Sequence, residues 1–141
     1  MKETICTALG VIGSFITTIF GGWDTGMITL IIFMTIDYIT GLLVAGVFKK
    51  SKKSTSGGLE SKAGWKGLCR KGVTLLIVLV AYRLDLLLTT TYIRDAVIIG
   101  FCVNELISLV ENAGLMGLPM PNVITKAIDL LTEKTNNNEL K

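Results

Sequence analysis

One cationic segment between two long apolar segments constrains this chain more than any other feature of its sequence. Residues 49–71 carry eight lysines or arginines against one acidic residue, Glu60, a formal charge of +7, although the whole chain carries only +3. The apolar flanks, 26–48 and 72–93, are each long enough to cross a bilayer. Lys and Arg are retained on the cytoplasmic side during insertion. The pattern therefore predicts a cytoplasmic loop made basic by Lys49, Lys50, Lys52, Lys53, Lys62, Lys66, Arg70 and Lys71.

The composition favours a membrane protein over a soluble domain. Half of the 141 residues are hydrophobic and the mean hydropathy is +0.62. Four apolar helices would leave a soluble chain of this length with too little polar surface to enclose them. The positive charge is confined to one membrane-adjacent loop, so we expect no nucleic-acid partner. Such a loop can instead attract the anionic lipids of a bilayer.

The residue types needed for most catalysis are missing from the sequence. The chain has no histidine, and Cys6, Cys69 and Cys102 are scattered without CxxC spacing. Imidazole bases, nucleophile–histidine pairs and most zinc sites are therefore excluded, and no nucleotide-binding glycine motif occurs. We expect no enzyme, no cofactor and no metal.

The apolar pattern predicts an all-α integral membrane protein with four transmembrane helices, over 4–23, 26–48, 72–93 and 96–118. Residues 1–3 are too short and mixed for a signal peptide, so the first span is retained. With the basic loop in the cytoplasm and four spans, both termini also lie in the cytoplasm. The fourth segment is the most interrupted by polar residues. If it lies in the interface, the chain has three spans and its C-terminus moves outside.

Residues 1–121 form the expected transmembrane domain, and residues 122–141 a cytoplasmic appendage. Pro119 and Pro121 end the fourth span. Asn122 can cap a short amphipathic helix that lies on the membrane or packs on a neighbour, before a disordered tail, TNNNELK. Small residues that allow close helix contacts in lipid are Gly10, Ser14, Gly21, Gly41 and Ala45. The alternative is that such residues are simply common in membrane helices.

Charged residues also lie within the predicted spans. Asp37 lies twelve residues before Lys49 and Arg83 twelve residues after Lys71, which places both about 18 Å from the cytoplasmic boundary. Glu105 reaches a similar level on the fourth span. An unpaired charge there costs roughly 2.5–3.5 kcal/mol, so these groups must pair, neutralise or face water.

Two interpretations of these charges remain open. In one, Asp37 pairs with Arg83 inside a subunit, and Glu105 is protonated or hydrogen-bonded to Asn104. In the other, they form a polar seam that is hidden in closed oligomers and lines an aqueous opening once subunits rearrange. Asp85, two residues after Arg83, points away from it.

Residues 104–114, NELISLVENAG, followed by Gly117-x-Pro119-x-Pro121, resemble the C-terminal signature of the toxin-secretion/phage-lysis holin family. The resemblance extends from about residue 31 to 121. It includes Asp37, Thr40 and Gly41 in the second span, and Ser61, Gly64, Gly67, Arg70 and Lys71 in the basic loop.

The resemblance implies a phage- or prophage-encoded protein of the bacterial cytoplasmic membrane that is neither an enzyme nor dependent on a cofactor. It implies a homo-oligomer that forms lesions, through which an endolysin, or in some clostridial relatives a large toxin, leaves the cell as cargo. Schemes of the family often draw three spans, where the hydropathy here predicts four.

The signature residues Asn104, Glu105, Ser108, Glu111 and Asn112 recur every three to four positions and would form one polar stripe. In lipid such a stripe needs a protein partner or water, which suits an assembling pore. The alternative is that these residues only cap the helix and dock it on the third span. The full predicted seam is Asp37, Arg83, Asp85, Asn104, Glu105, Ser108, Glu111 and Asn112.

Two other functions remain compatible with the sequence. A small ion channel or transporter subunit is one, although no selectivity-filter motif or inverted repeat with broken helices is present. A regulatory antiholin, which shares the sequence pattern but blocks lesions, is the other. Leakage of a folded cytoplasmic enzyme favours a holin, whereas ion flux alone favours a channel.

Overall fold

The computed structural model describes residues 1–139, and this part of the chain is helical without any strand. Five helices follow one another: α1 (Lys2–Ile19), α2 (Thr25–Gly46), α3 (Ser61–Leu88), α4 (Ile93–Leu115) and α5 (Asn122–Glu139). The all-α prediction is confirmed. Among the described residues, α2 alone is long and apolar enough to be a membrane-span candidate, so the four-span topology stays a prediction.

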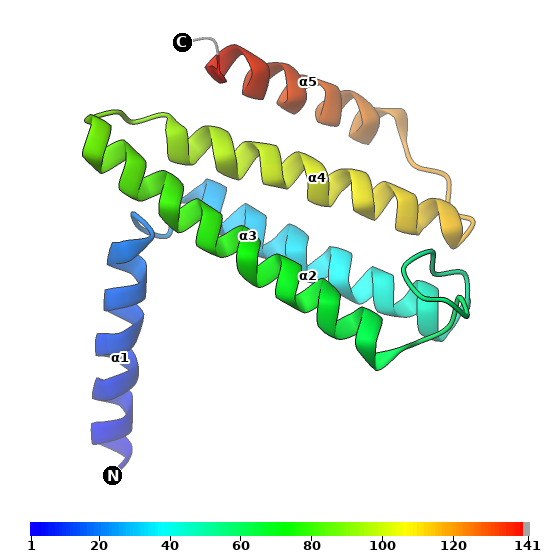
Figure 1. Cartoon of the computed structure of the whole chain (residues 1–141), viewed down its shortest axis with the longest axis horizontal. Coiled ribbons are helices and arrows are strands. Elements are labelled where there is room, and N and C mark those ends of the chain that lie inside the picture. Colours follow the sequence, from blue (N-terminus) through cyan, green and yellow to red (C-terminus); the bar gives the residue numbers. More distant parts are fainter. Residues whose placement is uncertain (140–141) are drawn as a thin grey trace.

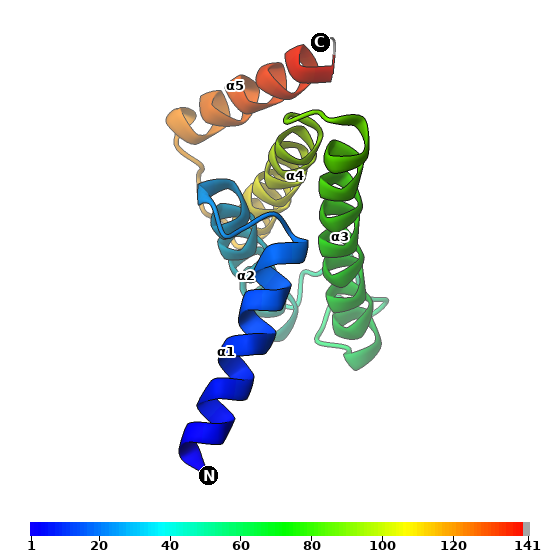
Figure 2. The same ribbon diagram turned by 90° about the vertical axis from the view of Figure 1, so that its left-hand side faces the viewer.

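Helices α2, α3 and α4 run side by side in alternating directions (Figures 1 and 2). Helix α4 lies between α5 on one side and α2 and α3 on the other. It contacts α2, α3 and α5. The buried core joins three of these helices, through Met27, Leu30 and Met34 of α2, Val78 of α3, and Ile98 and Cys102 of α4. Burial of these apolar side chains is what holds the three long helices together.

Helix α1 projects away from this bundle (Figures 1 and 2). None of its residues is buried. It joins α2 through Gly21 and Gly22, whose φ angles of 81° and 100° lie in the left-handed region that favours glycine. A Cβ on Gly21 would also lie 2.7 Å from the ring of Tyr82. The corner between α1 and α2 is therefore fixed by two glycines, one of which lets α3 approach closely.

The predicted basic loop is half helical. The connection ends at Glu60, and Lys62, Lys66, Arg70 and Lys71 lie on α3. The predicted boundary was wrong because it was set by charge alone. Lys62, Lys66 and Arg70 recur every four positions, which places them on one exposed helix face, while Gly64 and Gly67 face Tyr38 of α2.

Helix α5 begins at Asn122, as predicted, but continues to Glu139. The predicted disorder of residues 135–139 is therefore wrong, and residues 140 and 141 lie outside the described part of the chain. The helix packs on α4, with Ala127, Ile128, Leu131 and Thr135 half-buried. The sequence allowed this helix either to lie on the membrane or to pack on a neighbouring helix, and in the structure it packs on α4.

Candidate functional site

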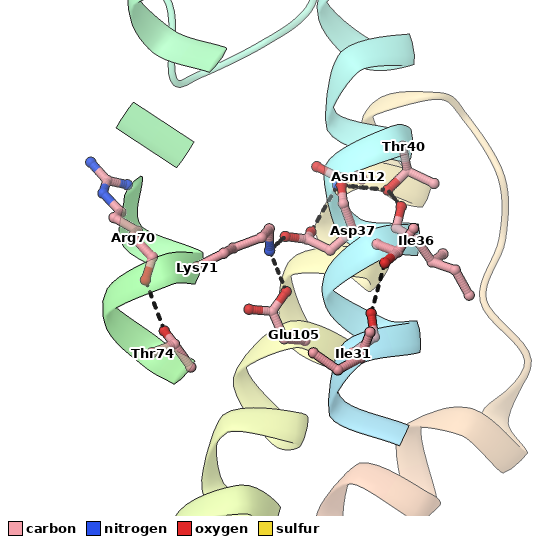
Figure 3. A network of polar contacts seen from close by, with 10 residues as sticks. Ile31, Ile36, Asp37, Thr40, Arg70, Lys71, Thr74, Glu105 and Asn112 are labelled. Atoms are coloured by element: carbon pink, nitrogen blue, oxygen red, sulfur yellow. Dashed lines mark hydrogen bonds and ion pairs between the residues drawn. The ribbon is translucent and has the colours of Figure 1, made fainter. Parts of the chain in front are cut away.

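A buried ion-pair network joins the three long helices (Figure 3). The Lys71 ammonium of α3 lies 2.8 Å from Oδ2 of Asp37 on α2 and 2.6 Å from Oε2 of Glu105 on α4. The three side chains are 15%, 6% and 13% exposed, respectively. One cation therefore serves two carboxylates, each from a different helix, in surroundings where charge-assisted contacts are strong.

The helix boundaries explain why these three residues meet. Asp37 lies nine residues before the end of α2 at Gly46. Lys71 lies ten residues after the start of α3 at Ser61, and Glu105 lies ten residues before the end of α4 at Leu115. At about 1.5 Å per residue, all three reach the same level, roughly 15 Å from the loop end of the bundle.

The predicted pairing of Asp37 with Arg83 is therefore wrong. The sequence-based depth was counted from Lys71, but α3 begins ten residues earlier, at Ser61. Arg83 lies twelve residues beyond Lys71, about 18 Å further along the helix, and is exposed. The alternative partner proposed for Glu105, Asn104, is also replaced, because Glu105 contacts Lys71.

Asn112 of α4 completes the network (Figure 3). Its amide nitrogen donates to Oδ1 of Asp37 at 3.1 Å, to the Asp37 carbonyl at 3.3 Å and to Oγ1 of Thr40 at 2.9 Å. The Thr40 hydroxyl in turn donates to the carbonyl of Ile36. Both carboxylate oxygens of Asp37 are thus engaged, and no buried side-chain polar atom in the described part of the chain lacks a partner.

Most of the signature residues on α4 face this network. Glu105, Ser108, Glu111 and Asn112 border, with Asp37 and Lys71, a cavity of about 280 Å³ that extends to the loop between α2 and α3. Asn104 does not belong to this face: it is exposed and lines a hollow beside α5. One residue of offset turns a helical side chain by about 100°, so four of the five predicted stripe residues border one cavity, and the inclusion of Asn104 in the stripe is wrong.

A second polar cluster lies near the opposite end of the bundle, around Arg94 of α4. Its guanidinium donates to the carbonyls of Phe20 (2.7 Å) and Gly22 (3.0 Å) and contacts Oδ2 of Asp24 at 2.6 Å. Asp24 also accepts from the N–H of Met27 and so caps α2. A buried arginine thereby ties the α1–α2 corner to the start of α4.

Sequence reasoning missed this cluster, because residues 94 and 95 were interpreted only as a polar turn. The available signal was opposite charge in two turns that the predicted topology puts on the same side of the membrane. Asp24 and Arg94 are charged residues in those two turns.

Asp85, a member of the predicted seam, belongs to this second cluster and not to the network around Lys71. Its Oδ1 accepts from the Thr90 hydroxyl (2.6 Å) and from the N–H of Ile93 (3.0 Å), and its Oδ2 from the N–H of Arg94 (2.8 Å). These contacts satisfy the first free N–H groups of α4. The position of Asp85 near the end of α3 thus gives it a capping role.

The ion pair with Arg94 affects the acidity of Asp24. Partial burial by itself would raise the pKa of Asp24, but the Arg94 guanidinium and the N–H of Met27 outweigh it and hold that pKa below its ordinary value of 3.8. The carboxylate is therefore ionised at neutral pH.

The predicted small contact residues divide into two groups. Gly21 faces Tyr82, Gly41 would place a Cβ 3.9 Å from the Asn112 amide, and Ala45 is buried, so these three lie at contacts within the subunit. Gly10 has no neighbour within 4 Å of its Cβ position and Ser14 is exposed. Their role in contacts between helices stays a prediction.

No group of three His, Cys, Asp or Glu residues within residues 1–139 could hold a metal ion. The acidic and basic groups of the two clusters around Lys71 and Arg94 are committed to each other and to helix ends. The arrangement can hold helices in register, and it can expose charge if the helices separate.

Comparison with known proteins gives a consistent assignment. The sequence model of the bacteriophage holin family matches residues 14–133. An uncharacterised protein of Clostridium perfringens is 36% identical over 94% of this chain and 95% of its own length. An uncharacterised protein of Listeria monocytogenes is 37% identical over 92% and 87%. A protein of Bacillus phage phi105, named a probable holin, is 29% identical over 72% and 70%. No solved structure matches the chain.

Proposed function

The chain belongs to the bacteriophage holin family, and from this membership we propose that it accumulates in the bacterial cytoplasmic membrane and assembles there into lesions. Through these lesions an endolysin, or a large secreted toxin, leaves the cell. Family membership points to a membrane protein without enzymatic activity. We further propose four spans, with the loop between α2 and α3 and both termini in the cytoplasm.

The observation that carries this proposal is the extent of the family match. Residues 14–133 include all of α2, α3 and α4, and therefore every residue of the network around Lys71. A protein related to this chain over most of its length is named a probable holin. The motifs that resemble holins at the sequence level, Asp37-x-x-Thr40-Gly41 and the signature of residues 104–114, meet in that same network.

The structure supports a lesion formed between subunits. Within one subunit, apolar packing and the Lys71 network hold α2, α3 and α4 together. Helix α1, in contrast, leaves large apolar side chains exposed, including Leu9, Ile12 and Phe15. In lipid such a helix is free to pack on a neighbouring subunit, and subunits that gather this way could surround a hole.

Inducible expression in a bacterial host tests the proposal. We expect growth to stop abruptly after the protein accumulates, and a folded cytoplasmic reporter enzyme to appear in the medium when a matching endolysin is co-expressed. Arg83→Gln is a control variant to be compared with the wild type, because this exposed arginine lies outside the ion pairs of residues 1–139. It should leave release unchanged.

Three results would separate the alternatives. Loss of ion gradients without escape of protein would support a channel and contradict the lesion. Normal growth with the protein present in the membrane would support an antiholin. Recovery of the chain as a soluble monomer without detergent would contradict membrane insertion itself.

A further inference from the structure

The cavity that contains the Lys71 network opens toward a group of cations that the network does not use. Lys52 and Lys53 of the loop and Lys66 and Arg70 of α3 border the same 280 Å³ space. All four are exposed, and none of them forms an ion pair with another of residues 1–139. Lys71, the fifth cation of the lining, is already held by Asp37 and Glu105.

The carboxylates near these cations do not cancel them. Only Glu60 and Glu111 remain in the lining once Asp37 and Glu105 are assigned to Lys71. One oxygen of Glu60 already accepts three hydrogen bonds, from Thr55 and from the hydroxyl and N–H of Ser56. With Lys71 included, five cations against four carboxylates leave the lining with an excess of one positive charge, which suits a singly charged anion such as a phosphodiester.

Part of the remaining lining is apolar. Leu42, Leu59 and Leu115 border the same space, and Leu59 is 64% exposed. A free phosphate ion would gain nothing from these side chains, whereas a lipid could place its glycerol and first methylene groups against them. The combination of cations and leucines at one opening therefore matches an amphiphile with an anionic head.

We propose that this cavity is a headgroup site for an anionic phospholipid, in which Lys53 of the loop and Lys66 of α3 hold the phosphate and the leucines contact the glycerol region. The inference rests on the proposed cytoplasmic position of the loop, because the inner leaflet presents such headgroups there. It differs from a diffuse attraction between a basic loop and a charged surface. Lipid binding at a defined site should depend on which lysines are removed. Lipid binding by diffuse attraction should depend only on how many lysines are removed.

The chain offers a closely matched control for this distinction. The test variant Lys53→Gln/Lys66→Gln removes one loop cation and one helix cation from the lining. The control variant Lys50→Gln/Lys62→Gln also removes one of each, from exposed positions outside the lining. A third variant, Lys53→Arg/Lys66→Arg, keeps the charge and separates loss of binding from damage to the fold.

The experiment uses the purified full-length protein in a neutral detergent, with thermal unfolding followed by circular dichroism. Phosphatidylglycerol, phosphatidylcholine or inorganic phosphate is added at constant ionic strength. We expect phosphatidylglycerol to raise the melting temperature of the wild type progressively with its concentration, as binding to the folded state alone does, and the other two additives to have no such effect. The test variant should need roughly 25-fold more phosphatidylglycerol, whereas the control and arginine variants should stay near the wild type.

Equal weakening in the test and control variants would overturn the proposal in favour of diffuse attraction. A rise in melting temperature with inorganic phosphate alone would show a free-anion site and contradict the lipid assignment, and no effect of any additive would contradict the site altogether. Because the readout is binding and not lysis, failure of the lesion proposal would leave this result intact, and the reverse also holds.

Discussion

Lys71 is the cation of the network that joins α2, α3 and α4. It is a single ammonium between two carboxylates from different helices, so its removal leaves Asp37 and Glu105 facing each other without a cation. Breaking a buried ion pair by removing one partner typically costs about 3–5 kcal/mol. We therefore expect Lys71→Met to lower the free energy of unfolding by that order, measured by denaturant unfolding in detergent.

The companion variant identifies the cause of that loss. Lys71→Met combined with Asp37→Asn and Glu105→Gln removes the uncompensated carboxylates, and it should recover a large part of the lost stability. Arg83→Gln should change stability by less than about 0.5 kcal/mol, because Arg83 is exposed. If Arg83→Gln proved as damaging as Lys71→Met, the assignment of Lys71 as the partner of Asp37 would be wrong.

Asp24 gives the corner between α1 and α2 a pH dependence. Its pKa is lowered below 3.8 in the folded protein, against the effect of burial, by Arg94 and the Met27 N–H. The unfolded chain therefore takes up this proton at a higher pH than the folded chain does. The stabilising contribution is present above about pH 4 and is lost as the pH falls through the folded-state pKa.

Melting temperatures between about pH 5 and pH 3 test this sign. The wild type should lose stability more steeply with acidification than Asp24→Asn, because the variant has no carboxylate to protonate at this corner. Other acidic groups titrate in both proteins, so the difference between the two curves isolates Asp24. Parallel curves would show that the contact between Arg94 and Asp24 contributes nothing to folding.

At the scale of the elements, the connection between α1 and α2 is a constrained turn, with two consecutive glycines at positive φ. Gly22→Ala introduces only backbone strain, because φ is 100° and no atom lies within 4 Å of its Cβ position. Gly21→Ala adds a 2.7 Å contact with the Tyr82 ring. We expect Gly22→Ala to cost about 1–3 kcal/mol and Gly21→Ala to cost more, as measured by thermal unfolding.

A glycine on α1 itself provides the control for this pair. Gly10 lies within the helix and has open space around it, so Gly10→Ala should be neutral or stabilise α1 by about 0.5–1 kcal/mol. A loss of stability in Gly10→Ala similar to that in Gly21→Ala would mean that α1 is sensitive throughout and that the turn has no special role.

The same elements show what the sequence could predict and what it could not. Hydrophobic runs placed α2 and α4 within a few residues, because apolar length reports directly on helices of this kind. They did not place the start of α3, since Lys62, Lys66 and Arg70 make its first turns polar while its helical period continues. That one boundary error moved the expected partner of Asp37 from Lys71 to Arg83.

The candidate site, too, could be predicted from the sequence only in part. Their spacing predicted one face for the signature residues Asn104, Glu105, Ser108, Glu111 and Asn112. The structure brings the last four to one cavity and places Asn104 beside α5. The cluster around Arg94 could not be derived that way. Its contacts join residues more than 70 positions apart, and such pairs depend on how the helices pack and not on local period.

At the scale of the whole molecule, the position of α5 conflicts with a membrane-spanning α4. In the structure α5 runs back along α4 (Figure 1), and its Asn136 lines the same hollow as Ile93 at the start of α4. Lys126, Asp129, Glu133 and Lys134 are exposed on α5. Facing lipid, each would cost up to roughly 2.5–3.5 kcal/mol near the bilayer centre. We therefore predict that α5 leaves α4 on insertion and lies at the cytoplasmic surface.

Single-cysteine labelling in intact cells tests this rearrangement. In a background where Cys6, Cys69 and Cys102 are replaced, Asn137→Cys should resist a membrane-impermeant maleimide until the cells are opened, as should Ser56→Cys in the cytoplasmic loop. Thr91→Cys, in the exposed turn between α3 and α4, is the positive control and should react from outside.

If α4 spans while α5 stays packed along it, Asn137→Cys comes level with that outer turn. Labelling of Asn137→Cys from outside, with Ser56→Cys still protected, would therefore contradict the cytoplasmic position of α5. It would mean either that α5 remains on α4 or that the chain has only three spans, and labelling of Ser56→Cys would overturn the whole orientation.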